Sequence, residues 1–175
     1  MNKESIRKQL KLNRQSLSKN ECTVKSQRIC RCLAMMDWST IRTLHHYEPL
    51  LQLNEANINS FITLLHTDYP KLELYTSRNF NGTWEIVTRL GNRVSKIPQF
   101  DAVIIPALGF DSRLNRIGYG GGYYDKFLAT QTTAQKIGVC FEIGKLKHIP
   151  TEPYDIALDL IVTEAKVYEP QMTPD

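Results

Sequence analysis

The feature that most constrains the fold of this chain is a glycine-rich segment that follows a short apolar run. The run is Ala102–Pro106, and four of the nine glycines of the chain fall within the five positions 118–122. A β-branched run of this kind indicates a strand that is buried on both faces. Glycine permits positive φ and a close approach of the backbone to a ligand. We expect positive φ and such an approach at the four glycines, Gly118, Gly120, Gly121 and Gly122.

The same segment has the composition of an anion-binding loop. Its N–H groups can converge on an anion, and the helix that follows adds a positive dipole end. Arg116 supplies a cation before the glycines, and Asp125 supplies a carboxylate after them, which suits a phosphate with a bridging metal ion. The spacing matches neither a P-loop nor a dinucleotide fingerprint. A purely structural turn between strand and helix is the alternative.

Turn signals and apolar periodicity divide the rest of the chain into alternating helices and strands. Ser18 and Glu21 form a capping box, Asn54 is expected to cap a third helix, and Asn81-Gly82 indicates a hairpin with a connection longer than two residues. The expected helices cover residues 2–17, 18–36, 54–65 and 123–130. The expected strands cover residues 41–47, 72–76, 84–88, 102–105, 136–141 and 160–163.

This order predicts an α/β fold: a three-layer, open, mostly parallel sheet with helices on both faces and an N-terminal helical pair. We expect one domain over residues 1–175, a length that permits a substantial core. Ligands of such sheets bind beyond the carboxyl ends of the strands. The glycine loop is expected to leave the carboxyl end of strand 102–105, so the site should lie there.

Composition narrows the possible partners and locations. The net charge is +4 and the basic residues are dispersed, which argues against a nucleic-acid partner. No apolar stretch is long enough to span a membrane, and the charged N-terminus does not resemble a signal peptide. We therefore expect a cytoplasmic protein, a monomer, that acts on small molecules without a membrane partner.

The cysteines and histidines indicate no metal site. Cys30 and Cys32 are too close together for a zinc pair, and no second pair complements them. We expect the four cysteines to be reduced thiols. The histidines, which are His45, His46, His66 and His148, have no metal-ligand spacing and are expected to be structural.

The first predicted helix has a basic edge. On a helical wheel, Lys3, Arg7 and Arg14 fall within about 40° of one another, beside the apolar stripe that contains Leu10. One interpretation is a solvated edge of the helix. The other is that Lys3 and Arg7 reach over the glycine loop and contact a phosphate.

Two stretches of the sequence together resemble a known family. They are Pro106-Ala-Leu-Gly-Phe-Asp111 and Arg116-Ile-Gly-Tyr-Gly-Gly-Gly-Tyr-Tyr-Asp125. The pattern is similar to that of the 5-formyltetrahydrofolate cyclo-ligases, also called 5,10-methenyltetrahydrofolate synthetases. The resemblance extends to the start, Lys3-x-x-x-Arg7, and to the end, where Pro150, Asp155 and Thr163-Glu164 match.

The resemblance implies an ATP- and Mg²⁺-dependent cyclisation of 5-formyltetrahydrofolate to 5,10-methenyltetrahydrofolate, with ADP and phosphate released. Two residues, Arg116 and Tyr124, are expected to be catalytic, and Glu55 and Tyr124 are expected to bind the reduced folate. Asp125 and Asp155 are expected to bind the metal, with Asp159 as the fallback. The expected nucleotide contacts are Lys3, Arg7, Arg116, Gly118, Tyr119, Gly120, Gly121, Gly122 and Tyr123.

Several residues keep alternative interpretations. Without the resemblance, Glu55 is a first-turn helix residue and Asp155 a turn residue, while Tyr123 or Tyr124 could be aromatic core. Between residues 76 and 101 the chain departs from the family pattern, and there Trp84 is expected to be a core residue of a strand. Two other functions remain open: a related ATP-using enzyme with a different amide-like substrate, and a non-catalytic phosphate- or RNA-binding relative.

Overall fold

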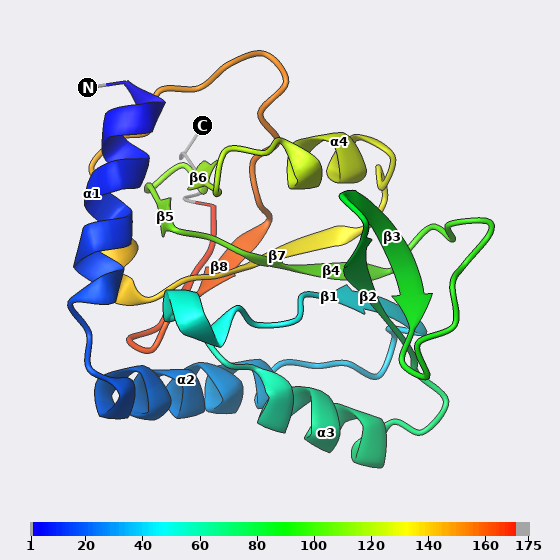
Figure 1. Cartoon of the computed structure of the whole chain (residues 1–175). Coiled ribbons are helices and arrows are strands. Elements are labelled where there is room, and N and C mark those ends of the chain that lie inside the picture. The colour runs from blue at the N-terminus through cyan, green and yellow to red at the C-terminus, as the bar shows by residue number, and fades with distance from the viewer. Residues whose placement is uncertain (1, 171–175) are drawn as a thin grey trace, which may run out of the picture.

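The computed structural model describes residues 2–170, which form a seven-stranded sheet and a smaller two-stranded one (Figure 1). The order in the main sheet is β3-β2-β1-β4-β7-β8-β9. Neighbours from β2 to β8 pair in parallel, whereas β3 and β9 add antiparallel edges. The strands are β1 Thr43–His46, β2 Glu73–Phe80, β3 Thr83–Thr88, β4 Ala102–Pro106, β7 Gln135–Val139, β8 Leu160–Val162 and β9 Val167–Tyr168; β5 Gly109–Phe110 and β6 Arg116–Ile117 form the second sheet.

Helices cover both faces of the main sheet, as predicted. Figure 1 shows α2 and α3 below the sheet and α4 above it, while α1 stands at one end beside β5 and β6. The helices are α1 Lys3–Gln15, α2 Lys19–Ala34, α3 Asn59–Asp68 and α4 Tyr123–Ala129, with 3₁₀ turns η1 Leu51–Leu53 and η2 Glu142–Gly144. The open α/β sheet and the N-terminal helical pair are therefore confirmed. No helix within residues 2–170 combines the length and the apolarity that a membrane span requires.

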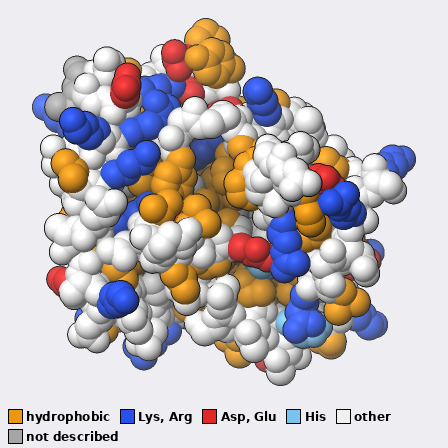
Figure 2. All heavy atoms as spheres, in the orientation of Figure 1, with side chains coloured by type: hydrophobic (Ala, Val, Ile, Leu, Met, Phe, Trp, Pro, Cys, Tyr) orange, Lys and Arg blue, Asp and Glu red, His pale blue; other side chains and the backbone are white. Residues whose placement is uncertain are grey.

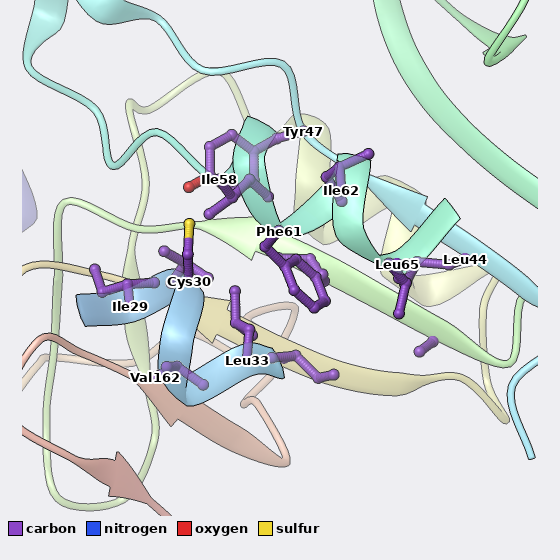
Figure 3. Packing of buried hydrophobic residues seen from close by; sticks show 14 of the residues in the cluster. Ile29, Cys30, Leu33, Leu44, Tyr47, Ile58, Phe61, Ile62, Leu65 and Val162 are labelled. Carbon is purple, nitrogen blue, oxygen red and sulfur yellow. The ribbon is translucent and has the colours of Figure 1, made fainter. Parts of the chain in front are cut away.

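The main sheet separates two hydrophobic layers. Below it, α2 and α3 pack against the sheet, and Leu33 of α2, Phe61 of α3 and Leu44 of β1 belong to one buried cluster (Figure 3). Above it, Phe127 of α4 packs in the second layer with Ile105 and other buried residues. All five residues of β4 are buried, which explains the continuous apolar run. Each fully buried Leu, Ile or Phe side chain contributes about 1.5–3 kcal/mol to folding.

The start of α2 follows the predicted capping box. Glu21 N donates to Ser18 Oγ over 3.2 Å, and Ser18 N donates to Glu21 Oε2 over 2.8 Å. Both N-terminal donors are thereby satisfied, and the helix begins at Lys19.

The predicted start of the third helix is wrong. Asn54 lies in the left-handed region with φ 51°, and α3 begins only at Asn59. The Asn54 side-chain amide instead donates to the carbonyl oxygens of Arg14 and Leu17, over 3.1 and 3.0 Å. It therefore satisfies carbonyl groups where α1 ends, and its left-handed backbone is not the extended conformation that an N-cap residue adopts.

The hairpin connection was also predicted wrongly, because both strands are longer than expected. β2 and β3 are joined by Asn81 and Gly82 alone, with φ 51° and 91°. Two successive positive φ values are what a two-residue hairpin turn of type I′ requires. The extra residues bring the carboxyl-terminal half of β2 to the functional site.

The position of α1 depends on a close backbone contact between β5 and η2. A Cβ on Gly109 would lie 2.6 Å from Gly144 O and 2.7 Å from Leu10 Cδ1 of α1. A Cβ on Gly144 would lie 2.5 Å from Leu108 O and 2.7 Å from Cys140 Sγ. These two glycines thus allow β5, η2 and α1 to meet.

We predict that Gly144→Ala lowers the free energy of unfolding by about 1–3 kcal/mol, because the methyl group meets backbone atoms that cannot move alone. The measurement is the midpoint and slope of urea denaturation. Gly121→Ala is the matched control, since a Cβ there meets no atom within 4 Å. Equal stability of the two variants would show that the backbone contact does not set this part of the fold.

Candidate active site

The carboxyl ends of β1, β2 and β4 open onto a cavity of about 600 Å³. Tyr47 follows β1, Ser77 belongs to β2 and Pro106 ends β4, and all three line the cavity. Figure 2 shows that this face of the molecule is hollowed near its centre between hydrophobic side chains, with lysine and arginine side chains to one side. The position agrees with the rule for ligand sites in open α/β sheets.

The structure brings the predicted site residues together in this one cavity. Its lining includes Lys3, Arg7, Glu55, Arg116, Gly118, Tyr119, Gly120, Gly121, Gly122, Tyr123, Tyr124, Asp125 and Asp155. Asp159, the fallback metal ligand, does not line it. Its Oδ2 accepts from Lys136 N over 2.7 Å, so it holds the start of β7 instead.

The glycine loop differs from the prediction in two respects. The chain forms β5 and β6 between β4 and the loop, so the loop follows β6 and does not leave β4 directly. Only Gly120 and Gly122 have positive φ, 103° and 66°, whereas Gly118 and Gly121 do not. Gly122 is the residue before α4, a helix of seven residues.

The first helix lies against this loop. Arg7 Nε donates to Gly118 O over 3.1 Å, and a Cβ on Gly120 would lie 3.4 Å from the same Nε. A Cβ at position 120 would therefore reach ordinary van der Waals contact with Arg7, and it is the φ of 103° that favours glycine there. The structure thus confirms that Arg7, on the basic edge of the first helix, reaches the glycine loop.

Lys3 contacts carboxylates across the cavity from the loop. Its Nζ donates to Glu152 Oε2 over 2.7 Å and to Asp155 Oδ2. Burial alone would lower the pKa of Lys3, but the two hydrogen-bonded carboxylates outweigh this effect and the pKa is raised. Lys3 therefore stays charged and fixes the segment that contains Asp155.

Arg116 holds Asp125 and the same segment. Its Nη2 donates to Asp125 Oδ1 over 2.7 Å, and its Nη1 donates to Ile156 O. The Arg116 side chain is only 5% exposed and that of Asp125 is 30% exposed. Asp125 therefore neutralises a buried guanidinium group in addition to lining the cavity.

The cavity has more carboxylates than cations. Four cations line it, Lys3, Arg7, Arg78 and Arg116, against five carboxylates, Glu48, Glu55, Asp125, Glu152 and Asp155. Within residues 2–170, Arg7 is the cavity cation without an ion pair. No cluster of three or more possible metal ligands occurs in the described part of the chain. A metal ion here would rely on one or two carboxylates and on a ligand's oxygens.

The Glu55 carboxylate joins the glycine loop to the segment that precedes η1. Tyr119 OH donates to Glu55 Oε1 over 2.8 Å, and Leu50 N donates to Glu55 Oε2 over 2.8 Å. Arg14, which is buried, donates to the same Tyr119 hydroxyl oxygen. Burial and the nearby Glu55 charge raise the pKa of Tyr119. The buried Glu55 is thus a fixed acceptor at the cavity wall rather than a first-turn helix residue.

An aromatic wall closes another side of the cavity. Trp84 was expected in a strand core, yet it is 48% exposed and lies 5.4 Å, centroid to centroid, from Tyr123. Tyr123 stacks on Phe127 at 5.9 Å and meets Tyr124 edge-on at 5.1 Å. Tyr123 and Tyr124 therefore both line the cavity and pack against the core. Trp84 sits on β3 at a position that faces the cavity.

A polar pair lies behind this wall. His45 Nε2 is 2.8 Å from Ser77 Oγ, and His45 is fully buried. Burial, with a smaller contribution from the neighbouring His46, lowers the pKa of His45 to about 3. Ser77 was missed because β2 was expected to end at residue 76, and Ser-Arg-Asn-Phe at 77–80 carried no strong strand signal. Arg78 was missed for the same reason, and with it the ion pair that it forms at 2.8 Å with Glu48, which follows β1.

Comparison with known proteins agrees with the fold and the motifs. The model of the 5-formyltetrahydrofolate cyclo-ligase family matches residues 1–164. A 5-formyltetrahydrofolate cyclo-ligase of Mycoplasma pneumoniae is 30% identical over 173 residues, which cover 94% of this chain and 99% of that protein. The corresponding protein of Mycoplasma genitalium is 30% identical over 172 residues, covering 93% and 98%.

Two solved structures have the same fold. The 5,10-methenyltetrahydrofolate synthetase of Mycoplasma pneumoniae aligns with a TM-score of 0.81 at 29% identity, covering 94% of this chain and 99% of that one. The Aquifex aeolicus protein of that name aligns with a TM-score of 0.81 at 20% identity, covering 100% and 96%. The fold and cavity define an α/β enzyme with a glycine-loop site. The chain belongs to the 5-formyltetrahydrofolate cyclo-ligase family, and it is a ligase.

We predict that buried His45 makes the protein sensitive to acid. Its folded-state pKa of about 3 lies below the unfolded value of 6.5, so the unfolded state binds the proton first. The contribution of neutral His45 to the free energy of unfolding is therefore fully present above pH 6.5. It is lost as the pH drops toward 3, by at most about 1.4 kcal/mol per pH unit for this proton.

The measurement is the free energy of urea unfolding from pH 7.5 to 4.5, for the wild type and for His45→Gln. The variant lacks this protonation site, so its stability should fall less steeply with pH, whatever its stability at pH 7.5. Identical slopes would mean that His45 is not held neutral by the fold.

Proposed function

We propose that this chain catalyses the ATP- and Mg²⁺-dependent cyclisation of 5-formyltetrahydrofolate to 5,10-methenyltetrahydrofolate, with release of ADP and phosphate. The observation that carries this proposal is the meeting of three features in one cavity: a glycine loop, an arginine without an ion pair, and two partly engaged carboxylates. Family membership supports the cyclisation itself.

The nucleotide phosphates would lie between α1 and the glycine loop. Arg7 is anchored by its Nε to Gly118 O, and its two terminal nitrogens have no partner within residues 2–170. They can therefore donate to phosphate oxygens, with loop N–H groups beside them. Arg116 and Lys3 add positive charge nearby, but each already neutralises a carboxylate.

The charge of the cavity supports a magnesium ion. Five carboxylates outnumber four cations, so a triphosphate would enter a site of negative formal charge. Asp125 Oδ2 and Asp155 Oδ1 have no hydrogen-bond partner in the part of the chain that the structure describes, and both residues line the cavity. One or two carboxylates plus phosphate oxygens are the usual protein environment of Mg²⁺, which would neutralise phosphate charge here.

The reduced folate would occupy the aromatic side of the cavity. Trp84, Tyr123 and Tyr124 offer surface for a flat ring, and Glu55 offers fixed carboxylate oxygens to the donor edge of a pterin. The segment that departs from the family pattern, residues 76–101, contributes to the cavity lining through Ser77, Arg78, Asn79, Phe80 and Trp84, whereas residues 85–105 contribute nothing.

The proposed reaction has two steps. The formyl oxygen of the substrate attacks the γ-phosphorus of ATP, and the bond from that phosphorus to the ADP oxygen breaks. N10 then attacks the activated formyl carbon and loses its proton, and phosphate leaves with the former formyl oxygen. The protein contributes positioning and charge: Arg7 and the loop hold the phosphates, Arg116 orients Asp125, and Tyr124 and Glu55 hold the folate.

We further propose that the chain acts as a cytoplasmic monomer on these small molecules, without a nucleic-acid partner. The four cysteines are free thiols, which suits a reducing compartment.

The proposed reaction is tested by the ultraviolet absorbance of 5,10-methenyltetrahydrofolate. It should appear only when protein, ATP, Mg²⁺ and 5-formyltetrahydrofolate are all present. ATP hydrolysis with other amide-like compounds, but none with 5-formyltetrahydrofolate, would instead identify an enzyme with a different substrate.

We predict that Arg7→Ala raises the Kd of MgATP by about 10- to 100-fold, since one charge-assisted hydrogen bond to a phosphate is lost. Isothermal titration calorimetry measures the Kd. Lys8→Ala is the matched control, because Lys8 is the neighbouring helix cation and is exposed outside the cavity. If both variants bound MgATP as the wild type does, the phosphates would have to lie elsewhere.

A further inference from the structure

A chain of hydrogen bonds runs from the buried sheet to the cavity wall, and the proposed reaction makes no use of its inner members. His45 Nε2 on β1 lies 2.8 Å from Ser77 Oγ on β2, and Ser77 Oγ lies 2.5 Å from Tyr123 OH on α4. Ser77 and Tyr123 line the cavity, whereas His45 is 0% exposed. Three elements therefore meet at one set of polar atoms.

The second ring nitrogen of His45 fixes the tautomer. Nδ1 is buried and has no hydrogen-bond partner among residues 2–170. The ring lies between Phe127 and Phe100, at 4.8 and 5.6 Å, so it is surrounded by apolar groups and stays neutral. A neutral imidazole has one N–H, and an unpaired buried N–H is rarer in proteins than an unpaired acceptor. The proton is therefore on Nε2, which donates to Ser77.

The direction of the next hydrogen bond follows from Ser77. Its oxygen accepts from His45, and its single proton also needs an acceptor because Ser77 is buried. Among the described residues, the remaining partner is the hydroxyl oxygen of Tyr123. If Tyr123 donated instead, the Ser77 proton would be buried without a partner. Ser77 thus donates to Tyr123, and the phenol proton is left for the cavity.

We propose that His45 and Ser77 are positioning residues that fix the Tyr123 hydroxyl as a hydrogen-bond donor to a carbonyl oxygen of a flat, ring-bearing ligand. The flat ring is indicated by Trp84, whose ring lies 5.4 Å from that of Tyr123 and is 48% exposed. The inference rests on the proposed function for the identity of the ligand, the reduced folate. It places the Tyr123 hydroxyl against the reduced folate, the ligand proposed for the aromatic side of the cavity that Trp84 and Tyr123 form.

The proton positions are tested first, without any ligand. Long-range ¹H–¹⁵N NMR on protein labelled with ¹⁵N-histidine should show His45 as the Nε2–H tautomer, with an unprotonated Nδ1. A protonated Nδ1 would overturn the proposal. This test does not depend on turnover, so it stands apart from any failure of the proposed function.

The positioning role is tested by a double-mutant cycle on Ser77→Ala and Tyr123→Phe. Each single variant should raise KM for 5-formyltetrahydrofolate by about 3- to 10-fold and leave KM for ATP within about twofold. The double variant should be no worse than Tyr123→Phe, because Ser77 acts only through that hydroxyl. Ser77→Thr, which keeps a hydroxyl group, should recover most of the loss caused by Ser77→Ala.

Three outcomes would overturn the proposal: multiplicative effects of the two substitutions, no recovery with Ser77→Thr, or equal increases of both KM values. A wild-type protein that converts no 5-formyltetrahydrofolate would contradict the proposed function instead, and the NMR result would still decide the direction of the hydrogen bonds.

Discussion

The contact between the first helix and the glycine loop is the interaction on which the site depends. Arg7 Nε and Gly118 O are 111 positions apart in sequence and 3.1 Å apart in space. Leu10, one turn further along α1, packs against Gly109. Arg14, one turn further again, donates a hydrogen bond to the Tyr119 hydroxyl oxygen. A helix that could not approach so closely would leave the loop without its cation.

Charge compensation is the second constraint on the cavity. Lys3 and Arg116 each hold a carboxylate, and through Asp155 and the Ile156 carbonyl they fix the same segment from two sides. Their positive charge is therefore already neutralised within the protein. In the proposed function, a phosphate group would obtain most of its charge compensation from Arg7, from loop N–H groups and from an added cation, and for this reason we propose a divalent metal ion.

Features fixed by local chemistry could be predicted from the sequence. The buried β4 follows from a continuous β-branched run, and the start of α2 follows from the Ser18–Glu21 capping box. The glycine motif predicted a site at the carboxyl ends of the strands, and the cavity lies there. The residues that it singled out lie together in one cavity, because parallel strands bring their carboxyl ends to a common edge.

Features that depend on distant partners could not be predicted. Asn54 was expected to cap a helix because its side chain can do so, but its backbone is left-handed and its side-chain amide donates to carbonyl groups at the end of α1. Trp84 was expected in the core because large aromatic residues in strands are usually buried, but β3 is an edge strand. The partners of Lys3 lie near residue 155, and no local pattern at residue 3 indicates them.

Calorimetric titration of the protein with ATP, in Mg²⁺ and in EDTA, is the most direct test of nucleotide binding in this cavity. We expect clear binding of MgATP and an affinity lower by about tenfold or more without the metal, since one such interaction is worth at least about 1.4 kcal/mol. Equal affinity under both conditions, or no binding of MgATP at all, would contradict the central claim that this cavity binds nucleotide phosphates through its loop, Arg7 and a metal ion.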